Sequence, residues 1–249
     1  MAAHILPRAG RGGGQGGALR RLLLVAAALV AAALVAGLVT AVVVLSTQQG
    51  SISAAHEAPA LLQGCLGGVD QQADPADCLV GRDVWLAAPS KPVSRLRTPV
   101  NLVVVHHTGT EPCRSRAKCV ELIRDLQQLH MAAPRNWSDI AFNFLVGGDG
   151  LVYLGRGWDT VGSHTLRWNN KSIGVAAIGT FTAATAPAAL QRALHQLLDW
   201  GVSLGKLAAD YGVLGACQVR PTDSPGERFM QDVRASPRWT NVSSGDGTC

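Results

Sequence analysis

The amino-acid sequence predicts an α/β or α+β domain, a central β-sheet with helices packed on it, preceded by a single membrane-spanning helix. From Cys78 onward, short β-branched apolar runs alternate with amphipathic helical stripes, a pattern typical of a sheet covered by helices. Ahead of that domain lies one long uncharged apolar run. The composition, 47% hydrophobic and 16% charged over 249 residues, excludes a disordered or collagen-like protein.

Residues 22–45 are expected to cross a lipid bilayer as a helix. The run holds 24 residues without a charge, and as a helix it would be roughly 36 Å long, enough for a hydrocarbon core of ~30 Å. Residues 1–21 carry four arginines and no acid, whereas residues 46–77 carry four acids and no Lys or Arg. The positive-inside rule then predicts a type II single-pass protein of the plasma membrane with a cytoplasmic N-terminus. The alternative is a cleaved signal peptide, whose apolar core is normally about 7 to 15 residues long.

The same patterns divide the chain into five parts. Residues 1–21 are a Gly-rich cytoplasmic tail that should be disordered, residues 46–77 an extracellular stem, residues 78–240 the globular domain and residues 241–249 a C-terminal tail.

An extracellular location agrees with the cysteines and the sequons. Six cysteines suit an oxidising space, and three Asn-x-Ser sequons, at Asn136, Asn170 and Asn241, are candidate glycosylation sites. Residues 78–249 hold 18 basic and 13 acidic side chains without charge runs, which gives no support to nucleic-acid binding.

The first half of the domain should contain three strands and a helix. Residues 102–105 are a β-branched apolar run too short for a helix, and this strand ends at His106. Residues 118–130 have apolar side chains at three- and four-residue steps and should form a helix. Strands 142–146 and 151–153 should pair as a hairpin, because the glycines between them supply the positive φ of a tight turn.

The second half should contain a strand and two helices. Residues 173–178 are expected to form the strand. An apolar stripe predicts a long helix over 187–204, with Pro187 near its first turn. A short third helix should cover 227–235, after Ser224-Pro225-Gly226.

The pair His106-His107 at the end of a buried strand could hold a zinc ion rigidly at the sheet edge. The alternative is a pair of groove-lining or core histidines without metal, since no HxxEH, HExxH or paired CxxC motif completes a site. Cys113 and Cys119 could close a small disulfide loop or, alternatively, supply a thiolate metal site.

The stretch Leu79–Trp239 resembles the peptidoglycan recognition protein domain, which is similar to type 2 N-acetylmuramoyl-L-alanine amidases. Several segments match in order: Gly81-Arg82-Asp83-Val84-Trp85, Val103-Val104-Val105-His106-His107-Thr108, Trp137-Ser138-Asp139-Ile140, Asn143-Phe144-Leu145-Val146-Gly147-Gly148-Asp149-Gly150, Gly155-Arg156-Gly157-Trp158, Gly162-Ser163-His164 and Ser172-Ile173-Gly174-Val175. The resemblance implies an α/β fold with a mixed central sheet flanked by three helices, a groove for a muramyl peptide, and a disulfide between Cys113 and Cys119.

The resemblance also implies that the amidase chemistry is lost. Of the family's three zinc ligands, the first is kept as His106, whereas the other two positions hold Ala216 and Ser224, so we expect no metal, no cofactor and no catalytic residue. Cys217 could not replace the missing histidine if residues 215–219 form a strand, because neighbouring side chains then point to opposite faces. The catalytic Tyr position holds Phe142.

Binding does not require those atoms. By resemblance, the groove positions that contact peptide and sugar are His107, Thr108, His130, Arg135, Phe142, His164 and Asn169. Family members that select meso-diaminopimelate at the third stem residue carry Gly-Trp and an Arg nineteen residues beyond the Trp; this chain has Asn136-Trp137 and Arg156. A guanidinium can bind the additional carboxylate of diaminopimelate bidentately.

Three functions follow from these residues. The first is a membrane-anchored, non-catalytic protein of innate immunity that senses or sequesters diaminopimelate-type muropeptides, with other peptidoglycan recognition proteins as co-receptors. The second is a degenerate domain that acts as an interaction module, decoy or negative regulator, for instance because a glycan at Asn136 covers the groove. The third is an active zinc amidase. The pairing of Cys65, Cys78, Cys217 and Cys249 stays open, because four cysteines allow three connectivities.

Overall fold

The computed structural model describes residues 78–242 and 247–249. Six strands form one sheet in the order β1-β4-β3-β5-β2-β6. They are β1 (Leu79–Val80), β2 (Val100–His107), β3 (Phe144–Val146), β4 (Val152–Leu154), β5 (Ile173–Ala177) and β6 (Leu207–Gly215). Only β3 and β4 pair antiparallel, and the other neighbours pair parallel. The sheet is therefore mixed, as the resemblance implied.

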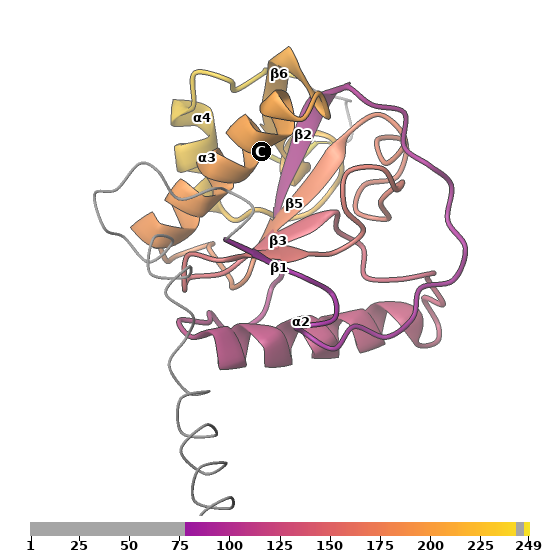
Figure 1. Ribbon diagram of the computed structural model, residues 1–249. Coiled ribbons are helices and arrows are strands. Elements are labelled where there is room, and N and C mark those ends of the chain that lie inside the picture. Colours follow the sequence, from indigo (N-terminus) through magenta and orange to yellow (C-terminus); the bar gives the residue numbers. More distant parts are fainter. Residues whose placement is uncertain (1–77, 243–246) are drawn as a thin grey trace, which may run out of the picture. The chain divides into compact units, whose positions relative to one another are not determined.

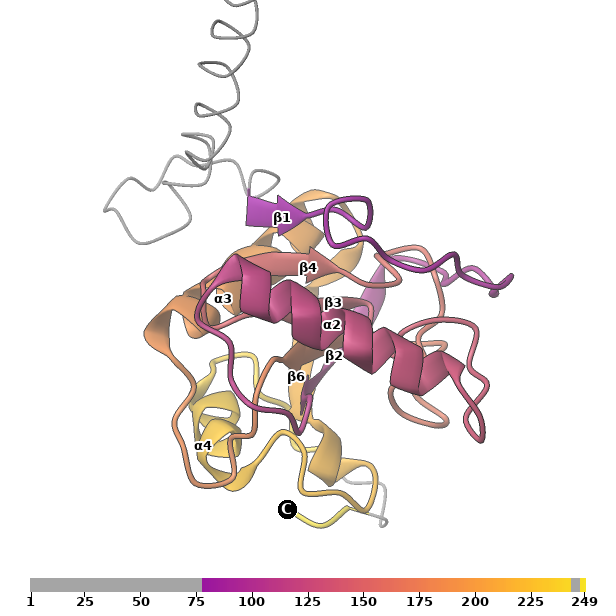
Figure 2. The same ribbon diagram turned by 90° about the horizontal axis from the view of Figure 1, so that it is seen from below.

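Three helices cover the two faces of the sheet (Figures 1 and 2). Helix α2 (Arg116–Met131) lies on one face, and α3 (Ala188–Ser203) and α4 (Glu227–Ala235) lie on the other. All three predicted helices are confirmed, α4 with its predicted bounds and the other two within two residues. Pro187 lies directly before α3 as its N-cap, where a proline fixes the chain without losing a helical hydrogen bond.

Side chains alternate between two cores, as the period of a strand requires. In β3, Phe144 and Val146 pack with α3 and α4, whereas Leu145 packs with α2. In β2, Val103 and Val105 belong to the α3 and α4 side, and Val104 belongs to a small cluster on the opposite side. This alternation directs the next residue, His106, to the face that carries α2.

Two strands were not predicted. Strand β1 has only two residues, and β6 contains Ala, Asp and Gly, which are poor strand formers. Pairing with β2 along most of its length makes β6 a strand. The hypothesis that residues 215–219 continue as a strand is wrong: β6 ends at Gly215, and a 3-10 helix, η5 (Ala216–Gln218), follows.

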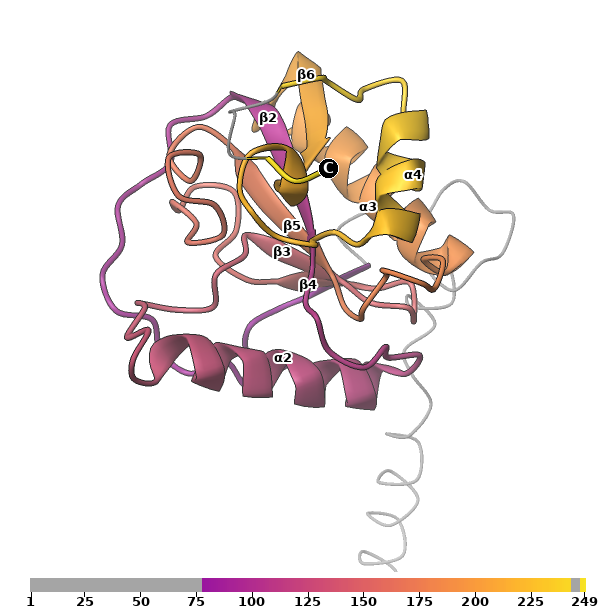
Figure 3. The same ribbon diagram turned by 180° about the vertical axis from the view of Figure 1, so that it is seen from behind.

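The C-terminal segment lies against the end of β6 and η5 (Figure 3). The predicted tail 1–21, membrane span 22–45 and stem 46–77 lie outside the described residues. Within the described part, no helix is both long and apolar enough to traverse a bilayer.

Candidate functional site

Four rings from separate parts of the chain form a continuous row, here called the ring row. His130 lies in the last turn of α2, Phe142 precedes β3, His106 lies near the end of β2, and His164 follows β4. Ring centroids are 5.9 Å apart for His130 and Phe142, 5.2 Å for Phe142 and His106, and 5.3 Å for His106 and His164. Trp137 extends the row, with its ring 4.9 Å from His130. The structure thus brings five of the predicted site residues together.

The histidines of the ring row are neutral at neutral pH. Burial is the main cause that lowers the pKa of His130 to about 4 and the pKa of His164 to about 3. Burial also holds the pKa of His106 well below its ordinary range. The backbone N–H of Ala141 donates to His130 Nδ1 at 3.1 Å, which places the proton of this neutral ring on Nε2. The row offers aromatic and imidazole faces without charge.

A hydroxyl connects two of these rings. Thr165 Oγ1 lies 3.1 Å from His106 Nε2 and 3.1 Å from His164 Nδ1. Asn169 supports this residue, because its side-chain oxygen accepts from the backbone N–H of Thr165 at 2.7 Å. The sequence reasoning missed Thr165, although it directly follows His164.

Glycines make room for His164. A Cβ on Gly174 would lie 2.3 Å from the His164 ring, and one on Gly162 would lie 2.4 Å from it. Contacts that short do not occur, so the ring can occupy this place only because both residues lack a side chain. The space that the His164 ring occupies therefore explains why glycine stands at positions 162 and 174.

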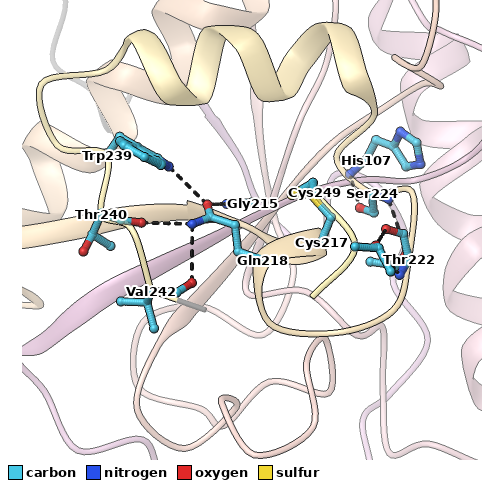
Figure 4. The surroundings of a disulfide bond; sticks show 11 residues. His107, Gly215, Cys217, Gln218, Thr222, Ser224, Trp239, Thr240, Val242 and Cys249 are labelled. Carbon is cyan, nitrogen blue, oxygen red and sulfur yellow. Dashed lines mark hydrogen bonds between the residues drawn. A yellow bond between two sulfur atoms is a disulfide. The ribbon is translucent and has the colours of Figure 1, made fainter. Parts of the chain in front are cut away.

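The positions of the family's zinc ligands do not fit a metal ion. Ala216 is fully buried in η5 and has no donor atom. Ser224 is buried, and its hydroxyl accepts from the backbone N–H of His107 at 3.0 Å (Figure 4). Within the described residues, no three His, Cys, Asp or Glu side chains are placed to hold a metal. His106 is a single remaining imidazole, and zinc needs three or four ligands.

Cys217 is unavailable as a ligand for a reason other than the one predicted. Strand alternation does not set the direction of its side chain, because this residue lies in η5. Its sulfur is instead bonded to Cys249 (Figure 4). A second disulfide joins Cys113 to Cys119, which confirms that pairing. Cys78 is also disulfide-bonded, and Cys65 lies outside the described residues.

The C-terminal residues fix the segment between η5 and α4. Besides the disulfide, the Thr248 backbone N–H donates to the Cys217 carbonyl at 2.6 Å, and the Thr248 hydroxyl donates to the Thr222 carbonyl at 2.7 Å. Gln218 donates to the Thr240 carbonyl at 3.0 Å (Figure 4). Through these contacts, the chain end holds in place the segment that carries Ser224.

Arg156 is a buried cation without an ion pair among the described residues. Its side chain donates to the backbone carbonyls of Ile140 at 2.6 Å, Val161 at 2.9 Å and Asp139 at 3.2 Å. The Asp139 carboxylate is paired with Arg82 instead, at 3.0 Å. Three of the five guanidinium N–H groups are thus used, and one remains on each terminal nitrogen.

An open cavity adjoins Arg156. It has a volume of about 350 Å³, and Arg82, Lys91, Asp139 and Thr160 are among its lining residues. Two of those lining residues are further cations. The predicted carboxylate-binding residue is therefore buried yet still reachable from solvent.

The remaining predicted groove residues lie outside the ring row. His107 accepts from the backbone N–H of Phe181 at 3.4 Å, and its Nε2 lies 3.8 Å from a carboxylate oxygen of Asp223. Thr108 Oγ1 accepts from the backbone N–H of Gly179 at 2.9 Å. Arg135 lies over Trp137, 6.0 Å from its ring centroid, at the far end of the row.

The three sequon asparagines are exposed. Asn136 has a positive φ of 51° and directly precedes Trp137, so it lies at the edge of the ring row. In the second sequon, Ser172 is fully buried and its hydroxyl donates to the Trp168 carbonyl at 2.7 Å. Because Asn136 is exposed and lies at the edge of the ring row, a glycan on it would project beside the row.

Comparison with known proteins agrees with this architecture. The family model described as N-acetylmuramoyl-L-alanine amidase matches residues 96–227. A peptidoglycan recognition protein of Bombyx mori is 44% identical over 171 residues, which cover 68% of this chain and 87% of that protein.

Two solved structures extend the comparison. The crystal structure of peptidoglycan recognition protein-LE in complex with tracheal cytotoxin, a monomeric diaminopimelic acid-type peptidoglycan, is 41% identical with a TM-score of 0.65, and the match covers 66% of this chain and 97% of that one. A structure of tracheal cytotoxin bound to the ectodomain complex of proteins LCa and LCx is 39% identical with a TM-score of 0.65, covering 66% and 99%. The chain therefore belongs to the peptidoglycan recognition protein family.

Proposed function

We propose that this protein binds diaminopimelate-type muramyl peptides without cleaving them. The observation that carries the proposal is the state of the zinc positions: Ala216 is a buried methyl group, and the Ser224 hydroxyl is engaged with the backbone. Hydrolysis in the amidases needs a metal-activated water, and a single imidazole cannot hold the ion. Phe142 also lacks the hydroxyl that the family's catalytic Tyr would supply.

The ring row supports binding in the absence of chemistry. Neutral, close-spaced rings offer flat apolar surfaces for sugar and peptide, with a few polar atoms at their edges. Two structurally similar proteins hold such ligands: protein-LE is in complex with tracheal cytotoxin, a monomeric diaminopimelic acid-type peptidoglycan, and the ectodomain complex of LCa and LCx is bound to tracheal cytotoxin. Binding to these ring faces does not depend on the two missing zinc ligands or on the missing tyrosine hydroxyl.

Arg156 supports selectivity for diaminopimelate. A buried guanidinium that donates only to backbone carbonyls lacks the counter-charge that buried cations normally have. Its two remaining N–H groups match the two oxygens of one carboxylate. A Lys-type stem peptide has no carboxylate at that place, so the positive charge of Arg156 would stay without a counter-charge.

We also propose that residues 22–45 anchor the protein in the plasma membrane, with residues 78–240 outside the cell. The protein would then sense muropeptide together with other peptidoglycan recognition proteins or sequester it. Cell-surface labelling, with sequencing of the N-terminus, tests this: a mature chain that begins after residue 45 would contradict the anchor.

Titration of the full-length chain with two muramyl tripeptides tests the binding proposal. One ligand carries meso-diaminopimelate and the other carries Lys at the third position. We expect both to bind and the diaminopimelate ligand to bind more tightly. Absence of binding to either ligand, also in an Asn136→Gln variant that cannot carry a glycan, would contradict the proposal and favour the interaction module.

A further inference from the structure

A second guanidinium lies near the ring row, at the end opposite to His130. Arg220 follows η5, and its Nη1 donates to the backbone carbonyl of His164 at 3.2 Å. Arg156 instead donates to the carbonyls of Asp139 and Ile140, close to the Ala141 N–H that donates to His130. Arg220 is thus placed at His164, whereas Arg156 reaches the His130 side of the row and, through the Val161 carbonyl, also approaches His164.

Both cations act on His164, and they differ at His106 and at His130. Burial is the main cause that lowers the pKa of both His106 and His164, and the Arg220 charge lowers both pKa values further. The Arg156 charge lowers the pKa of His164 and of His130. His164 thus lies within reach of both guanidinium groups.

The guanidinium of Arg220 keeps N–H groups that could donate to a ligand. Its side chain makes one hydrogen bond, and four of its five N–H groups have no partner in the described part of the chain. It is exposed to solvent. Asp223, an acid on the same segment, has a carboxylate oxygen 3.8 Å from His107 Nε2. No described carboxylate forms an ion pair with Arg220.

The base of this side chain is held in place. The backbone N–H of Arg220 donates to the Ala216 carbonyl at 3.1 Å, and the preceding 3-10 helix is bonded to the C-terminus through Cys217 and Cys249. An arginine on a fixed backbone loses less entropy when it binds a ligand than one on a mobile loop.

The chemistry of the ligand shows what Arg220 can meet. This step rests on the proposed function. His106 occupies the first zinc-ligand position, so its end of the row faces the bond between muramic acid and L-alanine that amidases cut. The next stem residue is D-glutamate, linked through its γ-carboxyl, and diaminopimelate follows. If Arg156 binds the diaminopimelate carboxylate, the α-carboxylate of D-glutamate falls nearer to His106, and Arg220 is held at the neighbouring ring, His164.

We propose that Arg220 is a specificity-determining residue that binds the free α-carboxylate of D-glutamate in the stem peptide. The groove then distinguishes two forms of peptidoglycan, one with this carboxylate free and one with it amidated to D-isoglutamine. An amide has no charge to match the guanidinium and presents an N–H₂ group in place of one acceptor oxygen.

Two muramyl tripeptides test the inference, both with diaminopimelate at the third position and differing only in D-glutamate or D-isoglutamine. Affinities are measured by calorimetry on the full-length chain in detergent at neutral pH. We expect the carboxylate form to bind about fivefold more tightly, the effect of one exposed ion pair. Arg220→Gln should abolish that preference, and Arg220→Lys should retain part of it. Arg192→Gln, an exposed change on α3, should leave it unchanged.

Failure of this inference can be told apart from failure of the proposed function. If the wild type binds both tripeptides equally, or if Arg220→Gln keeps the full preference, Arg220 does not read this carboxylate, and binding to both ligands still supports the proposed function. If the wild type binds neither tripeptide, both proposals are wrong. Because Arg220 is exposed, an unchanged unfolding midpoint verifies that its variants are folded.

Discussion

The backbone N–H of His107 donates to the Ser224 hydroxyl at 3.0 Å, and this hydrogen bond joins residues 117 positions apart. It connects the end of β2 to the segment before α4. The segment before α4 also packs closely against the backbone of Phe181. This requires Gly226, because a Cβ at that position would lie 2.4 Å from the Phe181 backbone. A position at which the amidases hold a zinc ligand therefore has a structural role in this protein.

Ser224→Ala should lower the free energy of unfolding by about 1 to 3 kcal/mol, because the buried His107 N–H loses its acceptor. Urea unfolding measures the change. Ser203→Ala serves as the control, since that hydroxyl lies on the exposed end of α3, and it should change stability by at most about 0.5 kcal/mol. Equal stability of Ser224→Ala and wild type would show that the hydrogen bond contributes nothing.

Ala216→His combined with Ser224→Cys should create a zinc site, because His106 is already in place as the first ligand. The wild type and each single variant should hold no stoichiometric zinc. Elemental analysis of the purified proteins measures this, and zinc in the wild type would contradict the account. Because Ala216 is fully buried, the larger imidazole should also cost stability. Good turnover should require Phe142→Tyr in addition.

Arg156→Val should remove most of the preference for diaminopimelate over Lys, which we expect to be about tenfold to hundredfold in the wild type. Arg156→Lys should restore only part, since an ammonium cannot form the paired contact. Trp137→Ala should weaken both ligands alike. Calorimetry with the two tripeptides gives the four affinity pairs, and an undiminished preference in Arg156→Val would refute the role of this residue.

The protein should lose stability as the pH falls from about 6.5 toward 4. The pKa of His130 is lowered to about 4 in the folded chain, whereas an unfolded histidine titrates near 6.5. Within that window the unfolded chain binds more protons, so the free energy of unfolding rises with pH and is lost as pH falls. Urea unfolding at pH 7 and pH 5 should show the drop, and His130→Gln should reduce it. An equal drop in that variant would assign the effect to other groups.

Cys249→Ser should destabilise the domain by roughly 2 to 4 kcal/mol, because the disulfide to Cys217 closes a loop with a sequence separation of 32. Cys217→Ser should have the same effect, and the double variant should be no worse than either single one. Additive losses would show that the two cysteines act separately.

The sequence predicts most of the fold because its strong elements have clear periods. The apolar stripes of α2, α3 and α4 locate those helices within two residues. Strand β6 is not predicted from the sequence because its own residues favour other structures. It forms a strand because it pairs with β2. Local propensity carries no information about such long-range pairing.

The site was predicted through motifs and corrected through geometry. His106, His130, Phe142 and His164 are brought into one row, which no spacing in the sequence reveals. Thr165 and Arg220 were missed, because a hydroxyl and an exposed arginine have no distinctive sequence pattern. The sequence does not determine the bond between Cys217 and Cys249, since four cysteines permit several pairings.

Recovery of the bound ligand tests the central claim most directly. The full-length chain is incubated with diaminopimelate-type muramyl tripeptide and added zinc, the complex is isolated, and mass spectrometry identifies the ligand that it contains. The account predicts a stoichiometric complex whose muramyl–alanine bond is intact after prolonged incubation. Two results would contradict it: release of free stem peptide above a blank without protein, or recovery of the protein with no ligand bound.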